Sequence, residues 1–255
     1  MSLRINQTDT QPGFFCPVCQ QMVPGFMPIG WESIALLNDC GYIHPFFQAE
    51  TFNIVNYYCP RCSASDRDRL YALFLEQFLN KLDKNTKHRF IDFAPAPQLQ
   101  RYLKKFPFLD YRSADLFAQN VDDRVDIMDM NIYDTESVDF FLCSHVLEHV
   151  SDDRKAIAEL YRILKPGKCG ILMVPIILTL QSTYEDPSIV SPEERWKHFG
   201  QDDHLRVYAK SDFIGKVKDA GFEIHQFDIS VFGAEIFKMH GIHKRSVLYI
   251  VTKQA

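Results

Sequence analysis

Four cysteines form two pairs whose spacing suits a metal ion. Cys16-Pro-Val-Cys19 and Cys59-Pro-Arg-Cys62 each leave two residues between their cysteines, so both sulfurs of a pair can reach one ion. Four thiolates complete the tetrahedral shell that Zn²⁺ prefers and leave no open position. The spacing therefore predicts a structural Zn²⁺ site on Cys16, Cys19, Cys59 and Cys62. Iron fits the same shell; a redox pair and four unconnected thiols are the less favoured interpretations.

Histidines in the second half of the chain can act as general bases, because an imidazole titrates near neutral pH. The candidates, in order of preference, are His204, His198 and His145. Residues 178–210 form a long connector between predicted elements, rich in hydrogen-bonding side chains. The side chains expected to bind a substrate are Tyr184, Arg206 and Tyr208. A guanidinium such as that of Arg206 can hold a phosphate or carboxylate. The alternative is a salt-bridged lid of Asp203, His204 and Arg206 without a chemical role.

Alternating strand and helix patterns from residue 88 onwards must position these side chains. Strands are expected at 89–93, 111–114, 138–144, 169–174, 222–230 and 246–253. Helices are expected at 69–82, 98–105, 152–164 and 211–220, the third with Ser151 as its N-cap and with Lys165-Pro-Gly167 as its stop. Repeated strand–helix units predict a mostly parallel sheet covered by helices on both faces.

Three consecutive segments carry a family resemblance. They are Met130-Asn-Ile-Tyr-Asp-Thr-Glu-Ser-Val-Asp139, Phe140-Phe-Leu-Cys-Ser-His-Val-Leu-Glu-His-Val150 and Glu159-Leu-Tyr-Arg-Ile-Leu-Lys-Pro-Gly167. Together they resemble the class I S-adenosylmethionine-dependent methyltransferases of the type 11 branch. The resemblance implies a Rossmann-like, doubly wound, mostly parallel seven-stranded sheet with an antiparallel C-terminal strand. We therefore expect a zinc-ribbon-like four-cysteine module with a helix at 1–85 and a methyltransferase domain at 86–255.

The cofactor residues are expected at the carboxyl ends of the strands, where open parallel sheets bind ligands. Asp115 ends the second strand, where an acid can accept both ribose hydroxyls of a nucleoside. The resemblance implies that Asp126 and Ile127 contact the adenine, with Asp129 as the competing acid. It also places the backbone at Ser144 and His145, after the strand at 138–144, against the methionine part. The full expected set is Asp92, Ala94, Asp115, Leu116, Asp126, Ile127, Ser144 and His145.

The loop after the first predicted strand departs from the family pattern. The loop Asp92-Phe-Ala-Pro-Ala-Pro97 has no glycine, where the family usually has a glycine-rich run that allows positive φ and close backbone approach. Ala94 and Ala96 are small enough for a ligand to approach. The missing glycines keep a non-binding domain open as an alternative. We interpret Glu148 and His149 as packing residues.

Composition and charge narrow the classes of function. The net charge is −5, and residues 1–85 carry six Lys or Arg against eight Asp or Glu, which disfavours a nucleic-acid binder. No apolar run is long enough to cross a membrane, and the N-terminus lacks a signal-peptide pattern. Seven cysteines without an export signal indicate a reduced, cytoplasmic protein.

The combined pattern favours a small-molecule methyltransferase, with a sugar nucleotide or a saccharide as the acceptor. The stretch His198-Phe-Gly-Gln201, with Asp203-His204 and Arg206, resembles a segment of relatives. Residues 178–210 are therefore expected to cover the site. Two other interpretations stay open. One is an rRNA base methyltransferase, since some of these carry an N-terminal zinc ribbon. The other is a zinc-bearing interaction protein on a degenerate methyltransferase fold.

Overall fold

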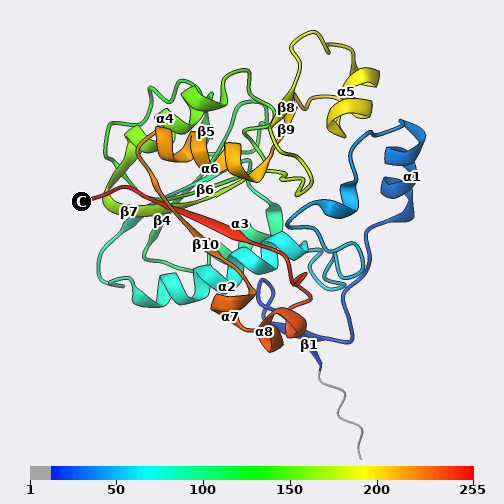
Figure 1. The fold of residues 1–255 in the computed structure, drawn as a ribbon. Coiled ribbons are helices and arrows are strands. Elements are labelled where there is room, and N and C mark those ends of the chain that lie inside the picture. The colour runs from blue at the N-terminus through cyan, green and yellow to red at the C-terminus, as the bar shows by residue number, and fades with distance from the viewer. Residues whose placement is uncertain (1–12) are drawn as a thin grey trace, which may run out of the picture.

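A seven-stranded sheet forms the centre of the computed structural model, which describes residues 13–255 (Figure 1). The sheet order is β10-β11-β7-β6-β3-β4-β5. Its strands are β3 (His88–Phe93), β4 (Leu109–Asp115), β5 (Asp123–Arg124), β6 (Val138–Ser144), β7 (Leu164–Met173), β10 (Glu223–Phe227) and β11 (Leu248–Thr252). Strands β3 to β7 pair in parallel, whereas β11 runs antiparallel to both β7 and β10. This confirms the expected Rossmann-like, doubly wound fold with an antiparallel C-terminal strand. The N-terminal segment that lacks a signal-peptide pattern falls partly outside the described residues.

Helices cover both faces of the sheet. Helices α2 (Asp66–Lys81) and α3 (Pro97–Leu103) pack on one face, and α4 (Asp153–Ile163) and α6 (Lys210–Asp219) on the other (Figure 1). The rings of Phe74 and Phe78 on α2 lie 6.4 and 4.7 Å from the ring of Phe140 on β6, so α2 is bound directly to the sheet. The longest of the described helices has 16 residues, and none of them is long and apolar enough to span a bilayer.

Capping side chains explain where two helices begin. Helix α2 starts before the predicted residue 69, because the Ser65 hydroxyl accepts from the Asp68 amide and the Asp68 carboxylate accepts from the Ser65 amide. This reciprocal pair is a capping box. The N-cap of α4 is Asp152, which accepts from the Lys155 amide at 3.0 Å. The prediction of Ser151 as that cap was therefore wrong by one residue.

The boundaries of two strands, β7 and β10, differ from the prediction. Strand β7 begins at Leu164, directly after α4, and its pairing with β6 shifts register between Val138 and Phe140. Lys165-Pro-Gly167 is thus part of an irregular strand rather than a separate turn. Strand β10 ends at Phe227 because Asp228 caps the short helix α7 (Ile229–Phe232).

The N-terminal segment shares the main hydrophobic core. It contains β1 (Phe14–Cys16), β2 (Gln21–Val23), α1 (Trp31–Asp39) and the 3-10 helix η1 (Phe46–Gln48). Buried Val18 and Phe26 belong to the same cluster as the sheet residues. The fully buried Arg69 of α2 donates to the carbonyl oxygens of Asn56, Tyr57, Ala64, His240 and Gly241. One guanidinium therefore joins the cysteine-bearing loop to the C-terminal end of α8 (Ala234–Met239). A division of the chain at residue 85 stays a prediction.

Candidate functional site

A cavity of about 620 Å³ lies at the carboxyl ends of β3, β4 and β6. This end of an open parallel sheet is where ligands bind. Six of the eight expected cofactor residues line it, namely Ala94, Asp115, Leu116, Asp126, Ile127 and His145. His149, Asp203 and Leu205 form part of its wall as well. The cavity thus joins the strand-end residues to the segment that follows α5 (Pro192–Phe199).

The glycine-free loop after β3 adopts the backbone conformation that glycine would otherwise supply. Ala94 has a φ of +50°, and its amide donates to the Ala114 carbonyl at 2.9 Å. His145, at the end of β6, has a φ of +57° and donates its amide to the Met173 carbonyl at 2.9 Å. Such strain is typical of functional sites. Both residues line the cavity, so the loop turns beneath it without a glycine.

Backbone amides of the residues that follow orient the side chains of Asp115 and Asp126, each through one carboxylate oxygen. Asp115 Oδ1 accepts from the Phe117 and Ala118 amides at 2.7 and 2.8 Å. Asp126 Oδ1 accepts from the Met128 amide at 2.8 Å. Within residues 13–255, neither Oδ2 atom has a hydrogen-bond donor, so each carboxylate is oriented and still able to accept from a ligand. Asp129 is exposed and does not line the cavity, which favours Asp126 for the adenine contact.

The two remaining cofactor candidates, Asp92 and Ser144, do not line the 620 Å³ cavity. Asp92 is fully buried, and burial raises its pKa to about 7 although the Tyr111 hydroxyl, donating at 2.7 Å, lowers it. Ser144 lines an adjoining cavity of about 250 Å³ together with Arg67, Asp68 and Tyr71. Its hydroxyl is 2.8 Å from the Tyr71 hydroxyl. Ala94 and His145 line both cavities, so the two spaces meet at these residues.

Arg67 is a site residue that the sequence interpretation missed. It belongs to the first turn of α2, next to the second cysteine pair, and its Nη2 donates to the Tyr57 hydroxyl at 3.4 Å. Burial opposes its charge, but Tyr57, Tyr71, Asp66 and Asp68 raise its pKa, so the guanidinium remains a cation. The only signal in the sequence was the charged run 66–69 after Cys62.

Histidine side chains gather at one wall of the large cavity. His145 Nδ1 lies 3.1 Å from Glu148 Oε1, and the rings of His149 and His204 lie 4.6 Å apart. Burial, with a contribution from Arg67, lowers the pKa of His145 to about 4, and burial also lowers the pKa of His204. Both imidazoles are therefore neutral near pH 7, and each is a weaker proton acceptor than a free imidazole. The structure brings these two base candidates together with Glu148 and His149.

The other predicted site residues lie outside the 620 Å³ cavity, and one of them, Arg206, lines a separate cavity of about 650 Å³. The His198 Nδ1 and the Tyr184 hydroxyl are 2.7 Å apart, and neither residue lines the cavity. Arg206 donates to the Leu147 carbonyl at 2.8 Å and to Glu185 Oε2 at 2.8 Å, so its guanidinium is occupied within the chain. Tyr208 is fully buried and donates to Asp153 at 2.7 Å. Through these contacts, Arg206 and Tyr208 hold the segment around β8 (Tyr184–Glu185) and β9 (Arg206–Val207) in place.

The four cysteines of the two pairs converge. The Sγ atoms of Cys16 and Cys62 lie 3.7 Å apart, and those of Cys19 and Cys59 lie 3.9 Å apart. All four Sγ atoms lie within 4.8 Å of one another. A tetrahedron with zinc–sulfur bonds of about 2.3 Å has sulfur–sulfur edges of about 3.8 Å. The cluster therefore has the dimensions of a tetrathiolate metal site.

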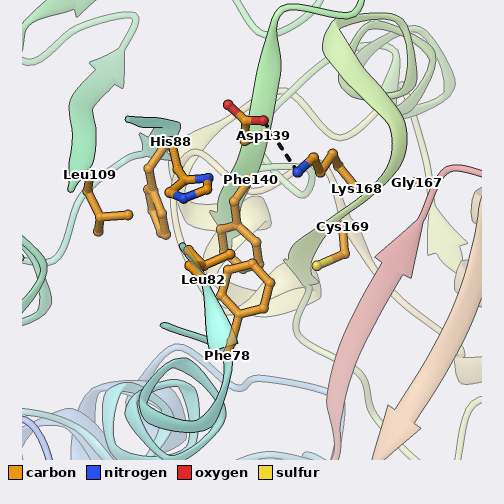
Figure 2. A pocket seen from close by; sticks show the side chains of 10 residues that line it. Phe78, Leu82, His88, Leu109, Asp139, Phe140, Gly167, Lys168 and Cys169 are labelled. Carbon is orange, nitrogen blue, oxygen red and sulfur yellow. Dashed lines mark ion pairs between the residues drawn. The ribbon is translucent and has the colours of Figure 1, made fainter. Parts of the chain in front are cut away.

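A smaller cavity at the opposite, amino end of the strands offers no comparable chemistry. Figure 2 shows its side chains, which are mainly apolar and enclose about 210 Å³. Its one carboxylate, Asp139, pairs with Lys165 at 2.9 Å and Lys168 at 3.6 Å. The Arg89 amide also donates to Asp139 at 2.9 Å. Because this carboxylate is fully paired, the cavity is packing space rather than a candidate site.

Comparisons with known proteins agree with this fold. A family model described as a methyltransferase domain matches residues 95–172. The crystal structure of the [4+2]-cyclase SpnF is similar over 91% of this chain and 100% of its own, with a TM-score of 0.52 and 15% identity. An S-adenosylmethionine-dependent methyltransferase from Mesorhizobium loti covers 69% of this chain and 95% of its own, with a TM-score of 0.44 and 14% identity. A SAM-dependent methyltransferase from Archaeoglobus fulgidus covers 74% and 93%, with a TM-score of 0.44 and 14% identity. No curated protein matches the sequence.

Proposed function

We propose that the protein is an S-adenosylmethionine-dependent methyltransferase that acts on a small molecule. The observation that carries this proposal is the 620 Å³ cavity at the carboxyl ends of β3, β4 and β6, with two oriented carboxylates on its wall. Its volume is that of a small-molecule site. The methyltransferase-domain match over residues 95–172 includes the part of that wall that lies between residues 114 and 151.

The chain's own residues supply the contacts that this cofactor needs. Asp115 would hold the ribose hydroxyls through its remaining carboxylate oxygen, and Asp126 would hold the adenine amine, beside the Ile127 backbone. The smaller cavity next to Ala94 suits the methionine part, and Arg67 on its wall suits the carboxylate of that part. When bound, the cofactor supplies a methyl group on a sulfonium, which makes that carbon electrophilic.

The protein's contribution to the transfer is then mainly positioning, with a base where the acceptor must lose a proton. His145 lines both cavities at the point where they meet, which favours it over His198 for that role. His204 does not line the cavity, but its ring lies 4.6 Å from that of His149, which does. A polar acceptor such as a sugar nucleotide or a saccharide suits this wall, since His149, Asp203 and Arg195 face the same space.

We also propose that the four cysteines bind a structural Zn²⁺. The sulfur–sulfur distances fit one ion, and a closed thiolate shell has no position for a substrate. Cys62 is separated from the capping residue Ser65 of α2 by two residues. The metal would therefore hold the first turn of α2, and with it Arg67, against the cofactor site.

Ligand-dependent thermal unfolding tests the cofactor proposal. A ligand that binds only the native state raises the melting temperature by mass action. We expect S-adenosylmethionine and S-adenosylhomocysteine to raise it saturably in the parent protein. Asp115→Ala should lose that rise, and Asp129→Ala, a matched removal of an exposed acid outside the cavity, should keep it.

The outcomes separate the alternatives. An equal loss of the rise in both variants would mean that the carboxylate at residue 115 is not specifically used. No rise in the parent protein would refute cofactor binding and favour an interaction protein on this fold. A rise in the parent protein would justify a screen of small polar methyl acceptors.

A further inference from the structure

Glu148 is a buried carboxylate that lacks a hydrogen-bond partner. Its side chain is 0% exposed, and neither Oε1 nor Oε2 is hydrogen-bonded within the described part of the chain. His145 Nδ1 lies at ion-pair distance, 3.1 Å from Oε1, without forming a hydrogen bond to it. A buried carboxylate without compensation is strongly unfavourable. The position therefore calls for a cation.

Two histidines lie within metal-binding reach of this carboxylate. One donor atom each from Glu148, His149 and His204 lies within 4.8 Å of the others. The backbone holds them together, because the Leu205 amide donates to the Glu148 carbonyl at 2.8 Å. The two imidazole rings meet edge to face at 4.6 Å. Segments distant in the sequence thus bring one oxygen and two nitrogen donors to one point.

The outer contacts of the two rings leave the same atom of each ring free. His204 Nδ1 lies 3.2 Å from the Phe199 carbonyl oxygen, and His149 Nδ1 lies 3.1 Å from Asp203 Oδ2. The hydrogen bond to the Phe199 carbonyl places a proton on His204 Nδ1 and leaves its Nε2 lone pair for a metal. The Asp203 carboxylate, at ion-pair distance, favours the same tautomer of His149. Metal-binding histidines almost always have such a carbonyl or carboxylate partner on their second nitrogen. The arrangement is therefore that of an oriented pair of ligands.

We propose that Glu148, His149 and His204 bind a divalent transition-metal ion on the acceptor side of the large cavity. Two imidazoles and one carboxylate suit Mn²⁺, Fe²⁺ or Zn²⁺ and leave further coordination positions open. His149 and its neighbours Asp203 and Leu205 line the cavity, so an open position is accessible to a bound small molecule. This site differs from the cysteine cluster in its donor atoms and in its access to the cavity.

A metal ion at this position indicates which class of compound accepts the methyl group. This inference rests on the proposed function. A hydroxyl or phenol oxygen that ligates the ion becomes more acidic, as metal-bound water does. Its proton leaves to water and the oxygen attacks the methyl carbon. The new oxygen–carbon bond forms as the carbon–sulfur bond breaks, with the electron pair kept by sulfur. The acceptor would therefore be a small hydroxyl compound that is methylated on oxygen.

Mn²⁺ binding to the full-length, zinc-loaded protein tests the site, because Mn²⁺ prefers oxygen and nitrogen donors to thiolates. The electron paramagnetic resonance signal of free Mn²⁺ falls as the ion binds, which gives a dissociation constant and a stoichiometry. We expect one saturable site in the parent protein, weakened by about tenfold or more in Glu148→Gln and His204→Ala. His225→Ala removes an exposed imidazole on β10 and should bind Mn²⁺ as the parent does.

S-adenosylhomocysteine binding, measured on the same samples, separates this proposal from the proposed function. Glu148→Gln should bind S-adenosylhomocysteine like the parent, which also shows that the variant is folded. Mn²⁺ binding without S-adenosylhomocysteine binding would leave the metal site standing and remove the methyltransferase proposal. Absence of a saturable site for Mn²⁺, and of a second equivalent of Zn²⁺ in calorimetry, would overturn the metal site whatever S-adenosylhomocysteine does. Unchanged Mn²⁺ affinity in both variants would overturn it too.

Discussion

Replacement of Arg67 by methionine tests whether the N-terminal segment contributes directly to the cofactor site. Arg67 lines the 250 Å³ cavity that adjoins Ala94 and His145. Among residues 13–255, its guanidinium makes one long hydrogen bond of 3.4 Å, to the Tyr57 hydroxyl, so most of its donors are available to a ligand. Methionine keeps much of the apolar stem and removes the charge.

The magnitude follows from the loss of one charge-assisted contact. Hydrogen bonds to a charged group contribute about 1.5–3 kcal/mol, which corresponds to a change in Kd of about 10- to 150-fold. Arg67 is only half-buried, so solvent screening favours the lower part of that range. We expect Arg67→Met to raise the Kd of S-adenosylhomocysteine by about 10- to 40-fold.

The assay compares two ligands by isothermal titration calorimetry. S-adenosylhomocysteine carries the amino-acid carboxylate, whereas 5′-methylthioadenosine has the same adenine, ribose and thioether without it. Arg67→Met should weaken the first ligand and leave the second within about threefold of the parent Kd. Equal weakening of both ligands would show a general distortion of the site. A change below about threefold for S-adenosylhomocysteine would refute a role for Arg67 in carboxylate binding.

Three further predictions concern stability and the cysteine cluster. Arg69→Met leaves several buried carbonyl oxygens without their donor and should lower the free energy of unfolding by about 3–5 kcal/mol in urea denaturation. Arg101→Met, at an exposed position of α3, should change it by less than about 0.5 kcal/mol. Cys62→Ser should reduce the zinc content measured by mass spectrometry and weaken S-adenosylhomocysteine binding through the adjacent first turn of α2. Cys40→Ser, outside the cluster, should do neither. Normal zinc content in Cys62→Ser would contradict the assignment of the four cysteines to a zinc site. Burial raises the pKa of Asp92 to about 7, above its value of about 3.9 in the unfolded chain, so the native state binds more protons in this window and stability falls as the pH rises from about 4 to 7. Asp92→Asn should therefore stabilise the ligand-free protein by about 1 kcal/mol or more at pH 8 and by less at pH 5, as thermal or urea unfolding at the two pH values would show, and equal effects at both would contradict the raised pKa.

Local patterns in the sequence predicted the architecture and much of the cavity wall. The strand and helix periods led to the observed sheet, since hydrogen bonding and side-chain alternation act over a few residues. The two-residue spacing of the cysteine pairs predicted their convergence. Asp115 followed from its position at the end of a strand, because the carboxyl ends of parallel strands meet at one edge of the sheet. Asp126 followed from the family resemblance.

Only the tertiary structure decided which distant side chains share a site. Ala94 takes a positive φ because the Ala114 carbonyl and the neighbouring strands hold it there, which the absence of glycine did not reveal. The guanidinium of Arg206 donates to carbonyl oxygens of the segment after β6, although its sequence context favoured a role in binding a substrate.

The same holds for Arg67 and for the group of Glu148, His149 and His204. Their residue types were visible in the sequence, but their environment was not. Burial, ion pairing and ligand geometry depend on which segments pack together, and that is determined by contacts between residues far apart in the chain. The sequence by itself therefore determined the sheet, the cysteine pairs and the strand-end acids, whereas the fold in three dimensions decided which histidines and arginines reach the cavity.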